Sequence, residues 1–303
     1  HIDEAHVKTW LSELRAEAIE RGISTQIFDR AFAQFKPIKR VIELDRKQPE
    51  GKWSFEQYLS NVVNEARVAQ GRRMYKQHRA TLDAVARHYG VAPQYIVALW
   101  GIETSYGNIT GGFDVIPALA TLAWEGRRAS FFRKELLEAL TIVDEGHIAL
   151  PHMKGSWAGA MGQNQFMPSS FQAYAVDGYG DGRKDIWTSL PDVFASSANY
   201  LSRHGWKDGE RWGRAVAVPA NFPESLTGLE TTKPLSEWKR LGVTLPNGAP
   251  IPVAKGFEAS LIAPDGLGGR KYLVYNNFRT VLKWNRSTYF ATAVGLLADR
   301  ISQ

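Results

Sequence analysis

The sequence predicts a mainly helical α+β protein that carries a small β-rich insertion in its second half. Through most of the first 205 residues, apolar side chains recur at steps of three and four, which is the period of helices packed on a core. From Trp206 to Tyr275 the pattern changes to short apolar runs between prolines and glycines, as in strands joined by turns. The helical period returns from Ser287 to Ile301.

The composition narrows the class of protein. The chain has 303 residues, a length typical of about two domains, and its 44% hydrophobic and 22% charged residues are ordinary for a globular protein. The absence of cysteine excludes disulfide bonds, thiolate zinc sites and cysteine nucleophiles. The net charge of +6 favours anionic partners, but no run of five or six basic residues occurs, so we expect no nucleic-acid binding.

No transmembrane segment is expected, because no stretch of about 18 apolar residues occurs. The chain begins with His1 rather than methionine, so we expect a trimmed or processed chain. Loss of a signal peptide or of a lipid anchor is consistent with this start.

The N-terminal part is expected to be helical. One continuous pattern runs from Val7 to Phe35 and stops before Pro37. Its recurring apolar positions are Leu11, Leu14, Ala18 and Ile19. Pro49 and Gly51 then mark a loop. From Phe55 to His88 the spacing predicts one or two long helices with many charges.

The next helix leads to a single glutamate. Gly90 suits a helix C-cap and Pro93 an early helix position, so a new helix is predicted here. Residues three or four apart lie on one face of a helix, and this face would consist of Ile96, Leu99, Trp100 and Glu103. Further helices are predicted at Ile116–Trp124, at Ser130–Asp144, from Pro168–Ser170 onward, and from Leu190 through Tyr200 to near Gly205.

The β-rich insertion is expected to hold short strands. The runs that predict strands include AVAVP, APIPVA, EASLIAP and KYLVY, all between Trp206 and Tyr275. The final helix would place on one side Phe290, Val294, Leu297 and Ile301.

The stretch YIVALWGIETSYGN places Glu103 at the end of an apolar segment. Because desolvation disfavours the charged form, a carboxyl group in such a setting keeps its proton to higher pH than usual. A glutamic acid that is still protonated near neutral pH can act as a general acid on a leaving oxygen. The alternative is structural: Glu103 bonds a nearby arginine or lysine at a helix end. Taken alone, the glutamate favours that alternative.

Four stretches of the chain stand out together: WGIETSYG, GSWAGAMGQNQFMPSSFQAYAVDGYGDGRKDIW, SANYLSRHGW and NRSTYFATAV. In this order they resemble the B-type membrane-bound lytic murein transglycosylases, and the match runs from about Tyr58 to the C-terminus. The resemblance implies a lysozyme-like fold. We expect a helical domain of residues 1–90 joined by a C-terminal helix 286–303, a catalytic core of residues 91–205, a small β-rich domain of residues 206–275, and a return segment 276–303 that lines the cleft and ends in the final helix.

The resemblance implies an enzyme that cleaves the β-1,4 bond between N-acetylmuramic acid and N-acetylglucosamine of peptidoglycan and leaves a 1,6-anhydromuramic end. By its place in the motif, Glu103 would protonate the glycosidic oxygen and then accept the proton of the muramic C6 hydroxyl as it attacks C1. Ordinary glycosidases use two carboxylates. No other acid between Glu103 and Asp177 lies in a comparable apolar motif. A hydrolytic muramidase and a non-catalytic peptidoglycan-binding scaffold stay open as alternatives.

The resemblance also assigns substrate-binding residues one by one. Ser156 would contact the catalytic carboxylate, and Gln165 would hydrogen-bond the N-acetyl or hydroxyl groups of the sugar. The remaining groove residues would be Phe166, Met167, Tyr58, Tyr200, Trp284 and Asn285. From the residues alone, each has a structural alternative: a turn serine, packed aromatic rings, or Asn285 as the N-cap of the final helix.

Two positions depart from the family pattern. Trp284 and Phe290 stand where the family often has tyrosine. Trp284 can still stack on a sugar ring. Phe290 lacks a hydroxyl group, so a hydrogen bond near the catalytic subsite is either lost or supplied by Tyr289.

The stretch DGYGDGRKDIW partly resembles a calcium-binding EF-hand loop. Asp177 and Asp181 occupy ligand places, but Tyr179 stands at the third place, where an oxygen ligand is needed. By the generic pattern alone the stretch is a solvated turn, which disfavours a calcium sensor. Some relatives bind calcium here, which makes Asp192 and the carbonyl group of Arg183 further candidate ligands. We therefore expect no required cofactor and a weak calcium site at most.

The resemblance finally implies a location and a partner. It implies the periplasm of a Gram-negative bacterium, with outer-membrane anchoring before trimming as an open alternative. The partner would be the glycan strands of peptidoglycan, an anionic polymer that suits the net charge of +6.

Overall fold

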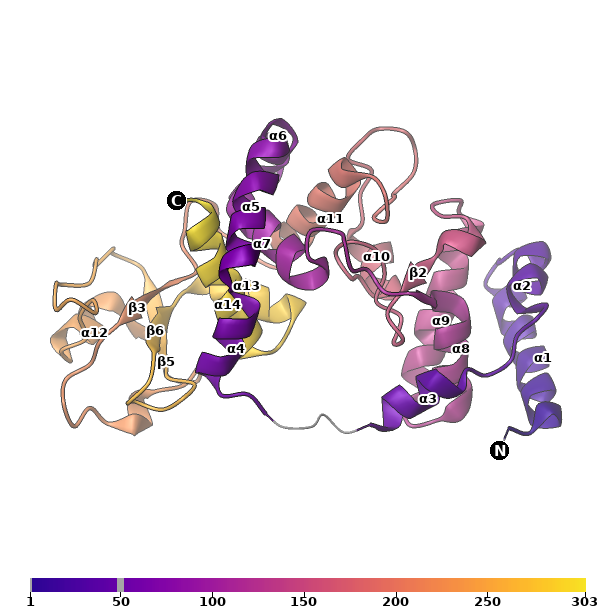
Figure 1. Ribbon diagram of the computed structural model, residues 1–303, viewed down its shortest axis with the longest axis horizontal. Helices are drawn as coiled ribbons and strands as arrows, with labels where there is room; N and C mark the ends of the chain where they lie inside the picture. The colour runs from indigo at the N-terminus through magenta and orange to yellow at the C-terminus, as the bar shows by residue number, and fades with distance from the viewer. Residues whose placement is uncertain (1, 48–51) are drawn as a thin grey trace. The chain divides into compact units, whose positions relative to one another are not determined.

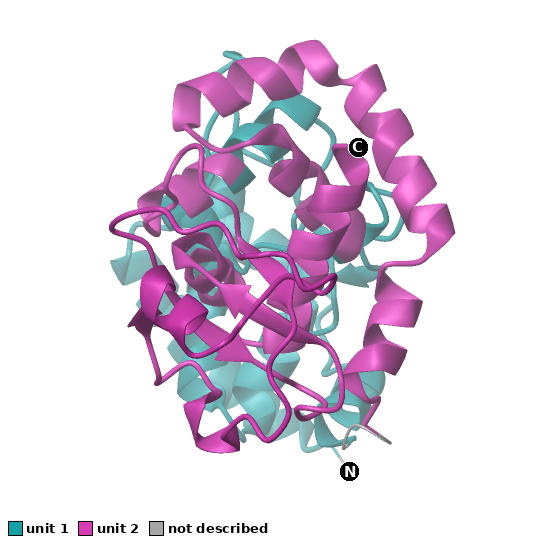
Figure 2. Ribbon diagram, turned by 90° about the vertical axis from the view of Figure 1, so that its left-hand side faces the viewer, with its two compact units in different colours: residues 1–50, 103–197 teal, residues 51–102, 198–303 magenta. Residues whose placement is uncertain are grey.

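The fold is that of a computed structural model, which describes residues 2–47 and 52–303. Helices predominate and the sheets are small and antiparallel, so the predicted mainly helical α+β class is confirmed. Two compact units form, one from residues 1–50 and 103–197 and the other from residues 51–102 and 198–303 (Figure 2). The division predicted from the sequence stays a prediction. The predicted loop at Pro49 and Gly51 lies outside the described residues.

The first unit begins with two helices where one continuous pattern was predicted: α1 (Glu4–Glu20) and α2 (Thr25–Phe32). The prediction was wrong because Gly22 takes a left-handed φ of 90° and ends the first helix. Ser24 then caps the second helix by accepting the N–H of Ile27. Ile19, assigned to the apolar face, is 37% exposed. A third helix, α3 (Lys39–Arg46), packs on α8.

The centre of this unit is the helix pair α8 (Val115–Glu125) and α9 (Ala129–Asp144), which pack along each other (Figure 1). Both were predicted within one residue at each end. A two-stranded antiparallel sheet joins β1 (Phe113–Asp114) to β2 (Lys154–Gly155). The sequence did not predict it, because each strand has only two residues. The helix entry at Pro168 is confirmed as α10 (Pro168–Tyr174), and a short 3₁₀ helix covers Leu150–His152.

The second unit holds three helices where one or two were predicted: α4 (Phe55–Val62), α5 (Glu65–Gln77) and α6 (Arg79–Tyr89). Asn64 interrupts the pattern because its side chain accepts the N–H of Arg67 and starts α5. Gly90 caps α6 with a φ of 69°, as predicted. Helix α7 (Pro93–Thr104) begins at Pro93 as predicted and ends in the first unit.

A four-stranded antiparallel sheet with the order β3-β6-β5-β4 lies in the second unit (Figure 1). Its strands are β3 (Gly213–Val216), β4 (Lys233–Pro234), β5 (Glu258–Ile262) and β6 (Lys271–Val274). The predicted strand APIPVA is wrong: Pro250 and Pro252 lack N–H donors, and this run makes an isolated bridge only. A short 3₁₀ helix covers Glu224–Leu226, and α12 (Leu235–Arg240) buries Trp238 against this sheet.

Two C-terminal helices complete the second unit: α13 (Asn276–Trp284) and α14 (Thr288–Ile301). The apolar side predicted for α14 is buried throughout, at Phe290, Val294, Leu297 and Ile301. Ser287, and not Asn285, caps this helix by accepting the N–H of Phe290, which corrects the structural role considered for Asn285. Helix α11 (Leu190–Arg203) runs from the first unit into the second.

Tyr95 on α7 is expected to make the second unit less stable at alkaline pH. Its hydroxyl oxygen accepts the N–H of Trp212 at 3.1 Å, and burial raises the pKa of Tyr95 to about 12. Because an unfolded tyrosine titrates near 10, stability that is complete below about pH 10 is lost as the pH rises towards 12, by roughly 3 kcal/mol. We expect Tyr95→Phe to flatten this decline in urea unfolding. The same change at Tyr179, which is 70% exposed, should leave it intact.

Candidate active site

Glu103 lies in the last turn of α7 and is half-buried. The preceding residues Tyr95 to Trp100 are all at most 4% exposed. The helix is therefore buried on every side rather than along one face, which corrects the predicted stripe. The carboxyl group stands where a deeply buried helix reaches the surface of the chain.

Thr104 ties this helix end to the glycine-rich loop. Its hydroxyl donates to the carbonyl oxygen of Gln163 at 2.7 Å and accepts the N–H of Gly107 at 3.1 Å. Thr104 is 1% exposed, so both bonds are shielded from water. The residue next to Glu103 is thereby held at a fixed distance from the loop.

Three successive residues after the helix are left-handed: Ser105, Tyr106 and Gly107, with φ values of 48°, 59° and 85°. This conformation is costly for residues with a side chain. At Gly107 a Cβ atom would lie 2.2 Å from Oε1 of Gln163. The amide group of Gln163 is itself fixed, because its Nε2 donates to the carbonyl oxygen of Trp187 at 2.9 Å. The turn after Glu103 thus needs glycine at its third position.

Ser156 opens the glycine-rich loop directly after β2. Its hydroxyl oxygen accepts the N–H groups of Ala158 and Ala160 at 3.3 Å and 3.0 Å. These bonds use the lone pairs and leave the hydroxyl hydrogen available to a nearby acceptor. The side chain is half-buried, and contact with the Glu103 carboxylate stays a prediction.

Gln165 adopts a left-handed φ of 56°, and its amide nitrogen donates to the carbonyl oxygens of Thr110 and Gly162, both at 3.0 Å. The loop therefore uses the amide nitrogen, and Oε1 is the atom suited to accept from a sugar N–H or O–H. Phe166 is buried, with 3% of its surface exposed, whereas Met167 is half-buried. Their role as a cleft wall stays a prediction.

The remaining predicted groove residues belong to the second unit. Tyr200 donates its hydroxyl to the carbonyl oxygen of Lys283 at 2.7 Å, and its ring lies edge-on to Trp284 at 5.0 Å. Asn285 is exposed and follows α13. Tyr58 is half-buried with its ring 5.5 Å from that of Tyr289. The predicted residues therefore fall into one set on each unit, and a single cleft formed by both sets stays a prediction.

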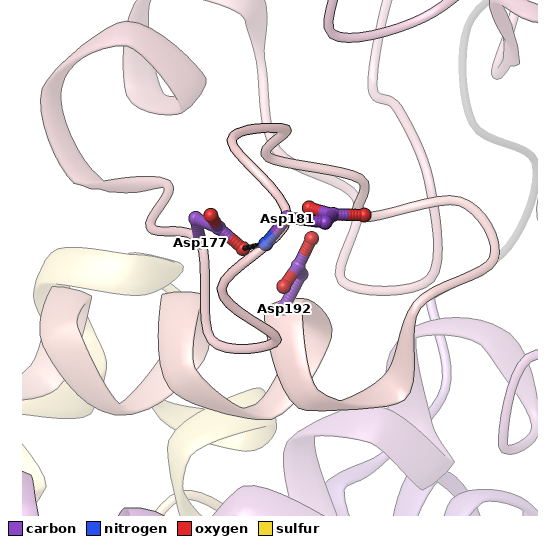
Figure 3. A group of neighbouring side chains, drawn as sticks. All are labelled: Asp177, Asp181 and Asp192. Atoms are coloured by element: carbon purple, nitrogen blue, oxygen red, sulfur yellow. Dashed lines mark hydrogen bonds between the residues drawn. The ribbon is translucent and has the colours of Figure 1, made fainter.

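Three carboxylates converge where the loop before α11 meets the first turn of that helix (Figure 3). Asp177, Asp181 and Asp192 each offer an oxygen atom, and these atoms lie within 4.8 Å of one another. In the described part of the chain, no lysine or arginine forms an ion pair with any of them. The Tyr179 side chain is 70% exposed and supplies no charge to the cluster.

Burial raises the pKa values of two of these acids, Asp177 and Asp192, whereas hydrogen bonds from backbone N–H groups lower them. Burial raises the pKa of Asp192, and the neighbouring charges of Asp177 and Asp181 raise it further. At Asp177 burial also favours a higher pKa, but hydrogen bonds from the backbone N–H groups of Gly182, Gly180 and Asp181 outweigh it, and the pKa is lowered. A divalent cation with oxygen ligands would compensate all three charges, so the donor set fits calcium.

The sequence interpretation missed Thr104 and Gln163, which join Glu103 to the loop. Thr104 follows the glutamate directly in ETSYG, and Gln163 precedes the assigned glutamine in GQNQ. The two residues are 59 positions apart in the sequence, so no local pattern predicts the hydrogen bond between them.

Comparison with known proteins identifies the family of the chain. The family model described as transglycosylase SLT domain matches residues 6–299. The chain is 33% identical to membrane-bound lytic murein transglycosylase B of Escherichia coli K12 over 298 residues, which cover 93% of this chain and 80% of that protein. Among the described residues, none of the helices is long and apolar enough to cross a membrane.

Two solved structures are closely similar. SltB3 from Pseudomonas aeruginosa in complex with NAG-anhNAM-pentapeptide is 46% identical, with a TM-score of 0.96 over 98% of this chain and 79% of that chain. The Escherichia coli lytic transglycosylase Slt35 in complex with calcium is 31% identical, with a TM-score of 0.82 over 96% of this chain and 92% of that chain. The match of the family model to nearly the whole sequence decides the assignment: the chain belongs to the transglycosylase SLT domain family of enzymes.

Proposed function

We propose that the protein is a lytic transglycosylase that cleaves the β-1,4 bond between N-acetylmuramic acid and N-acetylglucosamine of peptidoglycan and forms a 1,6-anhydromuramic end. Membership of the family supports the reaction class. SltB3, a 46% identical relative, was solved with a fragment that contains an anhydro sugar, which supports this product.

In this proposal Glu103 is the single acid and base. It first donates its proton to the glycosidic oxygen, so that the bond from C1 to that oxygen breaks. The carboxylate then accepts the proton of the C6 hydroxyl while that oxygen forms the new bond to C1. Because the nucleophile belongs to the bound sugar, the second step gains from proximity. The observation that carries this role is the place of Glu103 at the end of a buried helix that Thr104 ties to the glycine-rich loop.

Residues of the same unit would support the reaction. Ser156 can donate its free hydroxyl hydrogen to the Glu103 carboxylate in its ionised state. Gln165 would accept through Oε1 from the N-acetyl group of the substrate, since its nitrogen is held by the loop. Phe166 and Met167 would form the apolar wall. From the second unit the proposed groove residues are Tyr58, Tyr200, Trp284 and Asn285.

The mass of the released muropeptides tests the reaction. Digestion of purified peptidoglycan should yield products one water lighter than those of hydrolysis. Reducing-end products would instead mean that water reaches C1 and that the protein is a muramidase with a second catalytic group. Binding of peptidoglycan without any product would favour the non-catalytic scaffold.

We also propose that calcium binds weakly at Asp177, Asp181 and Asp192 and at the carbonyl oxygen of Arg183. The ion would tie the loop to the first turn of α11 and take no part in the reaction. An incomplete oxygen ligand set suggests a Kd on the order of 10⁻⁴–10⁻³ M. We expect calorimetry to show one calcium per chain and Asp181→Ala to remove it. Glu13→Ala, which changes an exposed acid on α1, should bind calcium with the affinity of the unchanged protein.

The proposed location is the periplasm of a Gram-negative bacterium. The named membrane-bound relative in Escherichia coli supports an envelope protein. Fractionation of cells that express the gene at its natural level would test this, and recovery in the cytoplasm would contradict it.

A further inference from the structure

A cavity lies wholly within the second unit, where the four-stranded sheet meets the start of α13. The cavity has a volume of about 470 Å³, within the range of small-ligand pockets. Its wall comes from the loop before β3, from the segment before β4, from the start of β5 and from the first turn of α13. None of the groove residues proposed above lines it.

The charges around this cavity are not neutralised by one another. Lys207, Lys255 and Arg279 line it together with the acids Glu210 and Glu258. None of these five side chains belongs to an ion pair formed within residues 2–47 and 52–303. Three cations against two acids leave one net positive charge, and the first turn of α13 adds the positive end of its helix dipole. The cavity therefore favours a ligand with carboxylates and offers acids for an amino group.

The walls of the cavity are held in place by buried polar contacts. Asn277 is fully buried; its side chain accepts the N–H of Lys207 and donates to the carbonyl oxygens of Lys207 and Glu210. Two residues further along α13, Nη2 of Arg279 donates to the carbonyl oxygen of Leu229 at 2.7 Å and to Oγ of Ser260 at 2.9 Å. The site is thus preformed, which reduces the entropy lost when a ligand binds.

The cavity also has an apolar patch on its wall. The rings of Phe257 and Tyr275 both line the cavity and meet edge-to-face at 6.3 Å. Such a surface suits small aliphatic side chains. Carboxylates, an amino group and small aliphatic side chains together describe a short zwitterionic peptide rather than a sugar or an inorganic anion.

Helix α13 connects this cavity to the proposed substrate groove. Its N-terminal turn contributes to the cavity, while Trp284 at its C-terminal end and the following Asn285 are proposed groove residues. A helix of nine residues is roughly 13 Å long. An extended pentapeptide spans up to about 17 Å. A peptide attached to a sugar beside Trp284 is therefore long enough to reach the cavity.

We propose that this cavity binds the carboxyl end of the stem peptide carried by muramic acid, with Lys207 and Lys255 pairing with its carboxylates. The inference rests on the proposed function, since the peptide is part of that substrate. It adds a peptide subsite on the β-rich part of the second unit to the sugar-binding groove.

Binding of the free peptide tests the subsite without any catalysis. Calorimetry would compare the synthetic stem pentapeptide with the same peptide amidated at its carboxyl groups. We expect the unmodified peptide to bind and the amidated form to bind about tenfold more weakly. The double variant Lys207→Ala/Lys255→Ala should bind the unmodified peptide with the same loss of affinity. The double change to arginine should retain binding, and Lys239→Ala, an exposed lysine on α12, should have no effect. Equal binding of both peptides, or of inorganic phosphate and the peptide, would overturn the proposal.

Cleavage assays separate this proposal from the proposed function. On peptidoglycan that carries its peptides, the double alanine variant should show a KM several-fold higher with an unchanged kcat. On strands stripped of peptide, variant and unchanged protein should be equal. A loss on both substrates would contradict the peptide subsite. If the unchanged protein cleaved neither substrate, the proposed function would be wrong. The calorimetric measurement of peptide binding would still show whether the cavity is a peptide subsite.

Discussion

Glu103→Gln is expected to reduce the release of anhydromuropeptides by at least about 10³-fold. General acid–base catalysis contributes typically 10²–10⁴-fold, and here one group would serve two successive proton transfers. Glutamine keeps the size of the side chain and removes its exchangeable acidic proton. The release of products would be followed by mass spectrometry under single-turnover conditions, so that slow product release does not mask the chemical step.

The control for this variant must show that folding and substrate binding survive. Glu13→Gln changes an exposed glutamate of α1 in the same way and should cleave at the normal rate. Glu103→Gln should still bind peptidoglycan and should unfold at an unchanged urea concentration. Activity within a few-fold of normal would disprove the role of Glu103, and another acid would then have to be sought.

Gly107→Ala is expected to destabilise the protein by about 1.5–3.5 kcal/mol and to lower its activity strongly. The left-handed φ of 85° alone costs an L-residue about 1–2 kcal/mol. The new Cβ atom would also stand 2.2 Å from Oε1 of Gln163. A flexible side chain could move away cheaply, but this amide holds the carbonyl oxygen of Trp187. Its displacement would sacrifice that bond, worth roughly 0.5–1.5 kcal/mol, and would shift the turn after Glu103.

Gly146 provides the matched control. It has nearly the same φ, 83°, and among the described residues no atom lies within 4 Å of its would-be Cβ. Gly146→Ala should therefore show the conformational cost alone, about 1–2 kcal/mol in urea unfolding, with normal activity. Equal destabilisation by Gly107→Ala and Gly146→Ala would mean that the Gln163 side chain moves aside at no cost. The turn after Glu103 would then not be fixed by this contact.

The sequence was most informative where a local signal exists. Gly90 and Pro93 marked one helix end and the next helix start, and the residues Ser130 to Asp144 have the length and period of a helix. Errors arose where the interruption was a single residue, as at Gly22 and Asn64, because the apolar period continues across it.

The candidate site was predictable as a motif but not as a geometry. Glu103 was assigned through the resemblance of its motif to a family, whereas Thr104 and Gln163 gained their importance only from a bond across 59 residues. The two-residue strands β1 and β2 have no period that a pattern could detect. The cavity beside α13 was equally invisible, because its lysines come from loops 48 residues apart in the chain, at Lys207 and Lys255.

Both units are built from separated stretches of chain, and this has a consequence for how a ribosome makes the protein. Helices α4 and α5 pack against α14, so residues 55–77 meet their partner only after nearly all 303 residues are synthesised. Until then the sides that face α14 have no native cover. The first unit, in contrast, is complete once residue 197 has left the exit tunnel. We expect nascent chains stalled shortly after that point to resist protease in the first unit while α4 and α5 are still cut.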